Sequence, residues 1–246
     1  MPKQGPWFIS ERVNWGGGDI VLPADESRHA VQVLRVAPPD VITVTDGAGA
    51  VARCAVKSVV DGRVVAEVLE TETQRQPKPR IAVYQGASRG AKLEDVAERL
   101  GQLGACQMWV FGCERSIVDW DEAKIRKQTD RWRARARGAA KQSRNPYIMD
   151  VGGWLDWAAL VERIAAEDFS VVLWEEASLP LRSALVGHSD RIALVVGPEG
   201  GLTRAETETL ADSGALIASL GPRILRTEDA PVVATTALLY HFGLIG

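Results

Sequence analysis

The sequence has few cysteines and histidines, and none of them forms a metal-binding pattern. The three cysteines are Cys54, Cys106 and Cys113. They include no C-x-x-C pair, and their odd number argues against a disulfide framework, so we expect reduced, buried thiols. The histidines His29, His188 and His241 are scattered and form no H-x-x-x-H pattern. The sequence therefore predicts no metal site.

Long apolar runs are also missing. No stretch approaches the roughly 18 to 20 apolar residues of a membrane span, and the N-terminal MPKQGPWFISER lacks the apolar run of a signal peptide. We therefore expect a cytoplasmic protein with no membrane partner. With 246 residues, 46% hydrophobic and 25% charged, the chain is long enough for one large domain or two smaller ones.

The formal net charge is only -3, but the basic residues are concentrated in one segment. Between residues 124 and 144 there are nine lysines and arginines and one acid, a local charge of +8. Four of these residues are spaced by four, four and three positions, which places them on one face of a helix. They are Arg133, Arg137, Lys141 and Arg144. A charge run is usually a solvated surface, but a segment this basic in an acidic protein favours contact with nucleic-acid phosphates.

Residues 1–72 have the pattern of a small β-barrel with one short helix. The expected strands are Trp7–Ser10, Val41–Thr45, Val51–Val60 and Val64–Leu69. Asp61-Gly62 separates the last two, and this dipeptide is typical of a type I′ hairpin turn. The stretch Glu26–Val36 has helical character and ends before Pro38-Pro39. The following polar, proline-containing stretch TETQRQPKPR, residues 71–80, contains the linker, which we place at residues 73–80.

Residues 81–246 alternate between strands and helices. Strands are expected at Ile81–Gln85, Gln107–Phe111, Ser170–Trp174, Arg191–Val196 and Leu216–Leu220. Helices are expected at Ala91–Leu103, Asp121–Ser143, Trp154–Ala166, Arg204–Ser213 and Glu228–Phe242. This alternation predicts an α/β domain whose mostly parallel sheet is covered on both faces.

Two glycine-containing loops follow strands near the C-terminus. In RIALVVGPEGGLTRAE, residues 191–206, the strand leads into Gly197–Gly201 and then into a helix with a Thr203/Glu206 capping box. Glycines let the backbone approach a ligand closely at the carboxyl end of a strand, although a turn without a ligand has the same composition. The segment is neither a G-x-G-x-x-G fingerprint nor a Walker A motif.

The second loop lies in SLGPRILRTEDAPVVATTALLY, residues 219–240. A strand ends at Gly221-Pro222, and Thr227, Glu228 and Asp229 then open an apolar helix with Pro231 in its first turn. Because the two loops occur close together in the sequence, we expect them to form adjacent backbone walls around one ligand.

The two loop segments resemble the C-terminal signature motifs of the RsmE family in the SPOUT methyltransferase superfamily. Upstream, Glu114-Arg115-Ser116 resembles the family's E-R-S segment, and AAKQSR at residues 139–144 resembles its A-x-x-Q-S-x-R region. His29 with Val33-Leu34-Arg35 resembles an element of its N-terminal PUA-like, RNA-binding barrel. The resemblance thus covers nearly the whole chain. The positions that depart from the pattern are Arg99, Gln102, Gly138 and Asp229.

This resemblance implies a SPOUT domain with a trefoil knot over residues 81–246, a homodimer, and methylation of uridine N3 in 16S ribosomal RNA or the small subunit. It implies S-adenosyl-L-methionine as cofactor, held by main-chain groups of the two loops. The implied cofactor-binding residues are Val195, Val196, Gly197, Pro198, Glu199, Gly200, Gly201, Ser219, Leu220, Gly221, Ile224, Leu225, Arg226 and Thr227.

Three residues are candidates for the chemistry. Arg226 would hold the uracil carbonyl oxygens and stabilise the N3 anion, and Glu199 or Glu228 would accept the proton. Either glutamate has an alternative role in capping a helix or balancing Arg226.

Candidate RNA contacts are His29, Arg35 and Arg115, together with the four residues of the basic helix. Arg35 has an alternative role as a structural ion-pair partner, and His29 as a packed side chain. Two other functions stay open on the sequence alone: methylation at another RNA position, such as a ribose hydroxyl, and non-catalytic RNA binding in ribosome assembly.

Overall fold

The computed structural model describes residues 5–12, 15, 18–185 and 190–246 and divides the chain into two compact units. The first contains Met1–Gln76 and Ala140–Ile148, and the second contains Pro77–Ala139 and Met149–Gly246. No helix in the described ranges is long and apolar enough to cross a membrane.

The first unit is built on a five-stranded sheet. Its order is β1 (Trp7–Ile9), β3 (Val41–Thr45), β4 (Ala50–Val60), β5 (Arg63–Thr73) and β2 (Asp19–Val21). β1 and β3 are parallel and the other pairs antiparallel. The four predicted strands are confirmed, whereas β2 was not predicted because three residues are too few to show an alternating pattern.

The hairpin turn and the short helix of this unit both follow from local sequence. Asp61 and Gly62 have φ values of 50° and 73°, as a type I′ turn between β4 and β5 requires. The helix begins two residues earlier than predicted, as α1 (Ala24–Arg28), and continues as a π-helical segment, η2 (His29–Val33). The sheet and these helical segments enclose an apolar core that includes Phe8, Ile20 and Ile42.

The segment 140–148 belongs to the first unit although it is remote in sequence. The Pro146 carbonyl accepts hydrogen bonds from the Thr45 hydroxyl and the Gly49 amide, each 3.1 Å long. The Tyr147 hydroxyl donates to the Gln74 carbonyl at 2.7 Å. These contacts group the segment with the first unit, although a boundary at residues 73–80 would assign it to the second.

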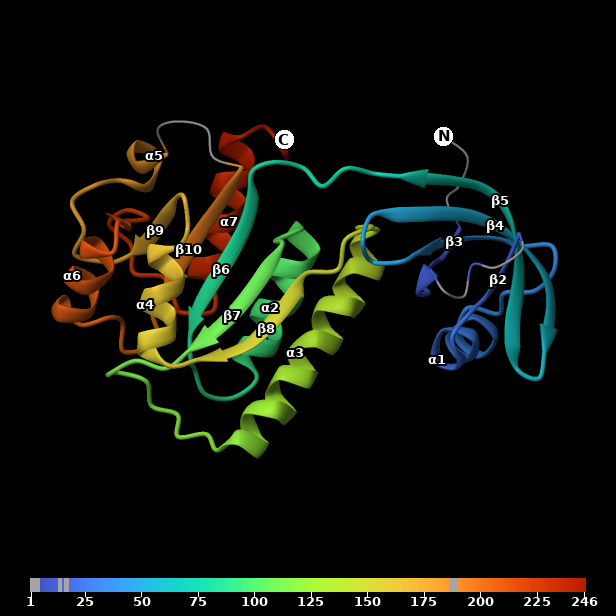
Figure 1. Cartoon of the computed structure of the whole chain (residues 1–246), viewed down its shortest axis with the longest axis horizontal. Helices are drawn as coiled ribbons and strands as arrows, with labels where there is room; N and C mark the ends of the chain where they lie inside the picture. The colour runs from blue at the N-terminus through green and yellow to red at the C-terminus, as the bar shows by residue number, and fades with distance from the viewer. Residues whose placement is uncertain (1–4, 13–14, 16–17, 186–189) are drawn as a thin grey trace. The chain divides into compact units, whose positions relative to one another are not determined.

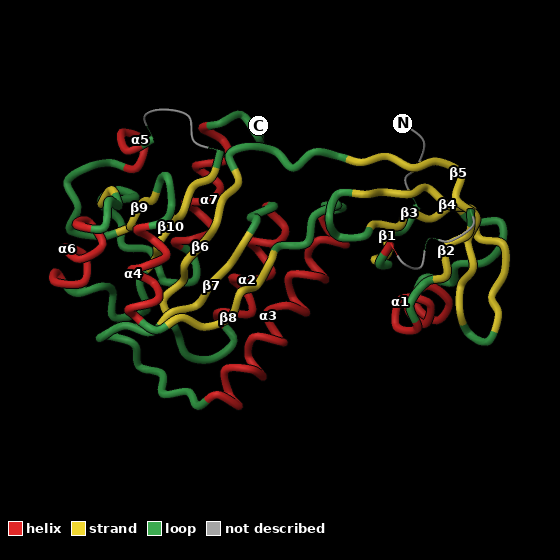
Figure 2. Tube along the Cα trace, viewed as in Figure 1, coloured by secondary structure: helices red, strands yellow, loops and turns green. Residues whose placement is uncertain are grey.

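The second unit contains a six-stranded parallel sheet (Figures 1 and 2). Its order is β11 (Leu216–Ala218), β9 (Ser170–Leu173), β10 (Arg191–Val196), β6 (Arg80–Gly86), β7 (Gln107–Phe111) and β8 (Asp150–Leu155). The prediction of a parallel sheet is confirmed. Strand β8 was not predicted because Gly152 and Gly153 interrupt its apolar pattern, and its last two residues were wrongly given to a helix.

Helices cover both faces of this sheet (Figure 1). On one face lie α2 (Lys92–Leu103), α3 (Glu122–Ser143), α5 (Leu181–Ala184) and α7 (Ala230–His241). On the other lie α4 (Trp157–Ala165) and α6 (Arg204–Asp212). Side chains of β10 alternate accordingly: Leu194 and Val196 pack in the first core and Ala193 and Val195 in the second.

Candidate active site

The glycine-containing loops meet at one edge of the parallel sheet. β9 lies between β10 and β11, so the carboxyl ends of these three parallel strands are neighbours. The loops that follow them line a cavity of about 560 Å³. A volume of this size lies within the range of small-molecule and cofactor sites, roughly 300 to 1,000 Å³.

The first loop, residues 197–202, is followed by a helix whose start is held by several hydrogen bonds. After the loop, the Thr203 hydroxyl accepts from the Glu206 amide at 3.2 Å and a Glu206 carboxylate oxygen accepts from the Thr203 amide at 2.8 Å, which confirms the predicted capping box. The other oxygen of Glu206 accepts from the Glu114 amide at 2.7 Å. Within the loop, Gly201 has a φ of 70°, a conformation that favours glycine.

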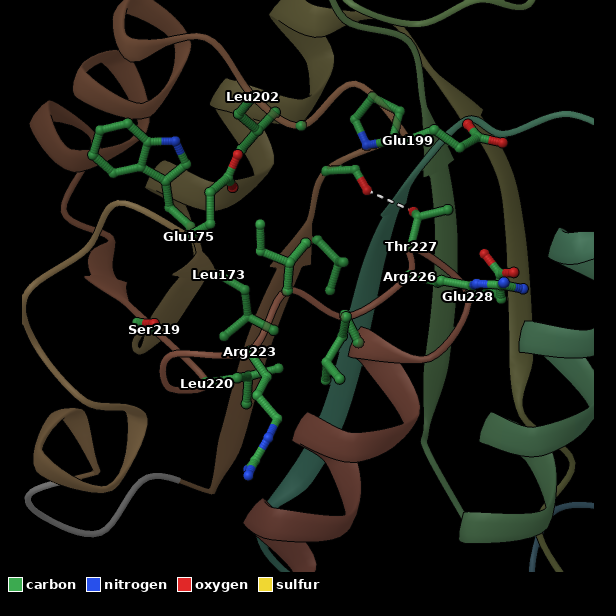
Figure 3. A pocket seen from close by; sticks show the side chains of 18 of the residues that line it. Leu173, Glu175, Glu199, Leu202, Ser219, Leu220, Arg223, Arg226, Thr227 and Glu228 are labelled. Atoms are coloured by element: carbon green, nitrogen blue, oxygen red, sulfur yellow. Dashed lines mark hydrogen bonds between the residues drawn. The ribbon is translucent and has the colours of Figure 1, made fainter.

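The Thr227 hydroxyl joins the two loops. It donates to the Gly197 carbonyl at 2.8 Å, as Figure 3 shows, and accepts from the Gln85 side-chain amide at 2.9 Å. Gln85 is fully buried at the end of β6. The predicted helix opening at Thr227 is therefore wrong: α7 begins at Ala230, and the threonine side chain binds the neighbouring loop instead.

Nearly all predicted cofactor-binding residues line this cavity. Those that do are Val196, Gly197, Pro198, Glu199, Gly200, Gly201, Ser219, Leu220, Gly221, Ile224, Leu225, Arg226 and Thr227. Val195 does not, because its side chain points to the opposite face of the sheet and is fully buried there.

The third wall of the cavity was missed by sequence reasoning. Leu173, Trp174 and Glu175 line it from the end of β9, and Figure 3 shows Glu175 across the cavity from Glu228. No glycine-rich motif follows β9 in the sequence. The end of this strand lies between the two recognised loops because β9 lies between β10 and β11 in the sheet. Lys92, Leu202, Pro222, Arg223, Glu228 and Ala230 complete the lining.

The two candidate general bases lie beside one lysine. The Lys92 ammonium is 3.2 Å from a Glu199 oxygen and 3.5 Å from a Glu228 oxygen. Glu199 also accepts from the Arg89 amide at 3.2 Å. The hydrogen bond that the Lys92 ammonium donates to Glu199 raises the pKa of Lys92, so the lysine is charged at neutral pH. Arg226, the third candidate for the chemistry, is exposed at the cavity.

Two of the four positions that depart from the resembled pattern contact each other. Arg99 of α2 lies 3.2 Å from the carboxylate of Asp229, which immediately precedes α7. Both side chains are about half exposed, so this pair adds little to stability by itself.

Some of the candidate RNA contacts have partners within the protein. Arg115 donates to the Gly200 carbonyl at 3.1 Å and thereby supports the first loop. Lys141 forms a 2.6 Å ion pair with buried Glu26, and Arg133 donates to the Val151 carbonyl at 3.2 Å. Arg144 follows the end of α3 with a φ of 58°, so the predicted helical face of four residues contains only three helical ones.

Acidic residues of α2 neutralise part of the basic segment. Arg131 and Arg135 of α3 form ion pairs with Glu94, and Arg135 also pairs with Glu98. Arg137 makes contacts of its own within the protein. In the first unit, His29 is half-buried and Arg35 is exposed in a left-handed conformation.

The cysteines are all unpaired thiols, and no cluster of three or more His, Cys, Asp or Glu side chains in the described ranges is placed to hold a metal. His188 lies outside those ranges. Only Cys54 is fully buried, and burial raises its pKa to about 12. The expectation that Cys106 and Cys113 are buried is wrong, because both are partly exposed.

Comparisons with known proteins agree with this architecture. Residues 74–239 match the model of an RNA methyltransferase domain, and residues 22–69 match that of an RNA methyltransferase PUA domain. The chain is 35% identical to ribosomal RNA small subunit methyltransferase E of Bacillus subtilis, over 91% of each chain. It is also 35% identical to the protein of that name from Mycobacterium bovis, over 90% of this chain and 86% of that one.

Solved structures give the same result. The S-adenosyl methionine-bound ribosomal RNA small subunit methyltransferase E from Neisseria gonorrhoeae has a TM-score of 0.86 and 26% identity, covering 96% of this chain and 98% of that one. A putative methyltransferase from Legionella pneumophila, in complex with its cofactor SAM, has a TM-score of 0.87 and 25% identity, covering 97% and 98%.

The parallel sheet with its loop-lined cavity and the separate PUA domain define an RNA methyltransferase. Within that class, the chain belongs to the family of ribosomal RNA small subunit methyltransferase E, the RsmE family.

Proposed function

We propose that this enzyme uses S-adenosylmethionine to methylate N3 of a uridine in small-subunit (16S) ribosomal RNA. The observation that carries the proposal is the cavity of about 560 Å³ between two backbone loops that the Thr227 hydroxyl joins. The relatives named for small-subunit ribosomal RNA support the substrate, and the SAM-bound structures support the cofactor.

The residues around the cavity suit this cofactor. Buried Leu173 and Val196 offer apolar surface to a base, while backbone groups of the glycine-containing loops offer hydrogen bonds. Glu175 adds a carboxylate that can accept hydrogen bonds from hydroxyl or amino groups. When bound, S-adenosylmethionine supplies a methyl group already activated by a sulfonium.

The side chains of the protein have to position the uridine and to accept its N3 proton. N3 lies on the Watson-Crick edge, so the base must leave its stack to reach the cavity. The exposed Arg226 guanidinium would hold the carbonyl oxygens and stabilise negative charge on N3. Glu199 or Glu228 would accept the proton, and the charge of Lys92 beside both offsets part of their negative charge.

RNA binding is assigned to the PUA domain and to the basic residues proposed above. Arg35 and Arg144 are exposed in the first unit, and Lys141 is ion-paired with Glu26. Because the substrate is ribosomal, we place the enzyme in the cytoplasm.

We further propose that the second unit is knotted and forms a homodimer. The chain leaves edge strand β11 and returns to α7, which packs against β6, β10 and α2, and this path supports a threaded connection. Apolar side chains exposed on α7 and the second loop, among them Val233, Tyr240 and Ile224, support a dimer surface.

Product analysis after methyl transfer is the decisive test. The wild type is expected to bind S-adenosylmethionine and S-adenosylhomocysteine in calorimetric titration, and to yield 3-methyluridine from small-subunit RNA or subunits. Arg226→Ala is expected to keep cofactor affinity and to lose at least 100-fold in kcat, the typical loss for a removed oxyanion donor. A methylated ribose in the product would instead assign a different position, and absence of cofactor binding to folded protein would refute the proposal.

A further inference from the structure

Helix α2 presents two cations to the loops that line the cavity. Lys92 and Arg99 are seven residues apart, which is close to two helical turns, so both lie on the same side of α2. Lys92 contacts Glu199 in the first loop and Glu228 in the second. Arg99 contacts Asp229, the residue after Glu228. The helix is therefore linked to both loops through side-chain charge.

The carboxylate charge of Glu228 has fewer compensating contacts besides Lys92 than that of Glu199. The Oε2 atom of Glu228 is buried and accepts no hydrogen bond from the described residues, and the Lys92 ammonium is 3.5 Å away. Glu199 has a second contact in the Arg89 amide. A buried carboxylate oxygen without a hydrogen bond is costly unless a cation is near it. Removing the charge of Lys92 would leave Glu228 without this compensation.

Helix α2 is packed into the hydrophobic core of the second unit. Its side chains Leu93, Val96 and Leu100 are buried in the core beneath the sheet, and α2 also packs against α7. Each loop, by contrast, contains exposed residues: Gly200 in the first and Ile224, which is 88% exposed, in the second. Contacts from α2 therefore connect exposed loop segments to a buried element.

We propose that Lys92 is a positioning residue that sets the spacing of the two cofactor loops through Glu199 and Glu228, with Arg99 and Asp229 as a second link. The inference rests on the proposed function, because it takes the cavity to be the cofactor site. In this role Lys92 acts on the two loops and takes no direct part in the transfer of the methyl group.

The first test compares Lys92→Met with Lys92→Arg. The methionine keeps much of the length and loses the charge, and it is expected to weaken S-adenosylhomocysteine binding about tenfold, an ordinary size for coupling between sites. The arginine is expected to stay within about threefold of the wild type. Lys57→Met is the matched control, because Lys57 pairs with Asp19 in the first unit.

Kinetics separate positioning from a direct role. For Lys92→Met we expect the KM for S-adenosylmethionine to rise about tenfold, while the KM for RNA changes less than about threefold. A loss confined to kcat, or a rise confined to the KM for RNA, would overturn the inference. The thermal midpoint is measured for each variant, so that a loss of folding is recognised.

A double-mutant cycle tests the route through the carboxylates. In a Glu199→Gln/Glu228→Gln background, Lys92→Met is expected to cost less than about twofold in affinity, because its partners are no longer charged. An undiminished tenfold loss would refute the route.

The second link is tested by exchanging its charges. Arg99→Glu is expected to weaken binding by repelling Asp229, and Arg99→Glu combined with Asp229→Arg is expected to restore it. No recovery in the double variant would remove Arg99 and Asp229 from the inference. If the wild type itself fails to bind either ligand, the proposed function fails. If it binds and Lys92→Met binds equally well, only the inference fails.

Discussion

One buried hydroxyl group, that of Thr227, connects the loops that line the cavity. Thr227 is 8% exposed and connects the second loop to Gly197 of the first and to Gln85 of β6. Local sequence predicts a helix cap at this threonine, but its hydroxyl donates to Gly197, 30 positions away, and accepts from Gln85, 142 positions away. Its function is therefore determined by the sheet order and not by its neighbours in sequence.

Replacing Thr227 by valine is expected to loosen this connection. Thr227→Val leaves the Gly197 carbonyl with only a long 3.4 Å hydrogen bond from Gln85. We expect a loss of about 1 to 3 kcal/mol in unfolding free energy, the usual cost of an unsatisfied buried group, and weaker cofactor binding. Denaturant unfolding and calorimetric titration measure the two effects.

The matched control for this substitution is Thr236→Val. The Thr236 hydroxyl donates only to the Val232 carbonyl one turn earlier in α7, at 2.8 Å. Equal losses of stability and affinity in both variants would contradict the special position of Thr227.

Tyr84 gives the stability of the second unit a dependence on alkaline pH. Its hydroxyl donates to Glu167 at 2.8 Å, and burial, followed by the contact with Glu167, raises its pKa from 10.0 to about 12. Because the folded state holds this proton more tightly than the unfolded chain, the stabilisation is complete below pH 10 and is lost as the pH rises toward 12.

Tyr84→Phe is therefore expected to lose stability less steeply than the wild type between pH 10 and 12. Thermal midpoints measured across this interval test the expectation, and parallel declines in the two proteins would be evidence against it. Buried Cys54 is present in both proteins, so its own alkaline titration contributes equally.

At the scale of elements, the contact between α2 and α3 depends on small residues. A Cβ at Gly101 would lie 3.0 Å from the Ala139 Cβ and 3.4 Å from the Ala136 backbone. Glycine here permits the close approach of the two helices, and the ion pairs of Arg131 and Arg135 with α2 extend the same contact to the surface.

Two glycine substitutions should have opposite effects on this pair of helices. Gly101→Leu is expected to destabilise the protein by about 1 to 3 kcal/mol through overpacking. Gly138→Ala is expected to stabilise it by about 0.5 to 1 kcal/mol, because a Cβ at exposed Gly138 meets no atom within 4 Å and alanine favours a helix. Chemical denaturation distinguishes these outcomes, and stabilisation by both would contradict the described packing.

At the scale of the whole molecule, association of two chains is a testable consequence of the exposed apolar side chains of α7. Tyr240 is 72% exposed and Val233 is 44% exposed. Introducing Val233→Asp together with Tyr240→Asp is expected to convert a dimer into a monomer, because buried unpaired charges oppose association. Light scattering after size-exclusion chromatography measures the mass.

A matched double substitution on another surface controls for added charge. Val59→Asp with Val60→Asp alters exposed valines of the β4 end in the first unit. This control is expected to remain dimeric. A monomeric wild type, or a dimer unaffected by the α7 substitutions, would count against the proposed surface.

The sequence by itself determined the local features of this protein. The Asp61-Gly62 turn, the Thr203/Glu206 capping box, the alternation of strands and helices, and both glycine-containing loops follow from backbone preferences and periodicity that act over a few residues. The same local signals failed for β2 and for β8, where three residues or two glycines leave no clear period.

Only the tertiary structure decided which distant groups meet. It brought the end of β9 between the two loops, and it placed Lys92 beside Glu199 and Glu228. It also paired Lys141 with Glu26 across 115 positions, so a residue expected to bind phosphate has a partner inside the protein. The physical reason is that charge pairing, burial and strand order depend on distances in space, which the period of a sequence does not encode.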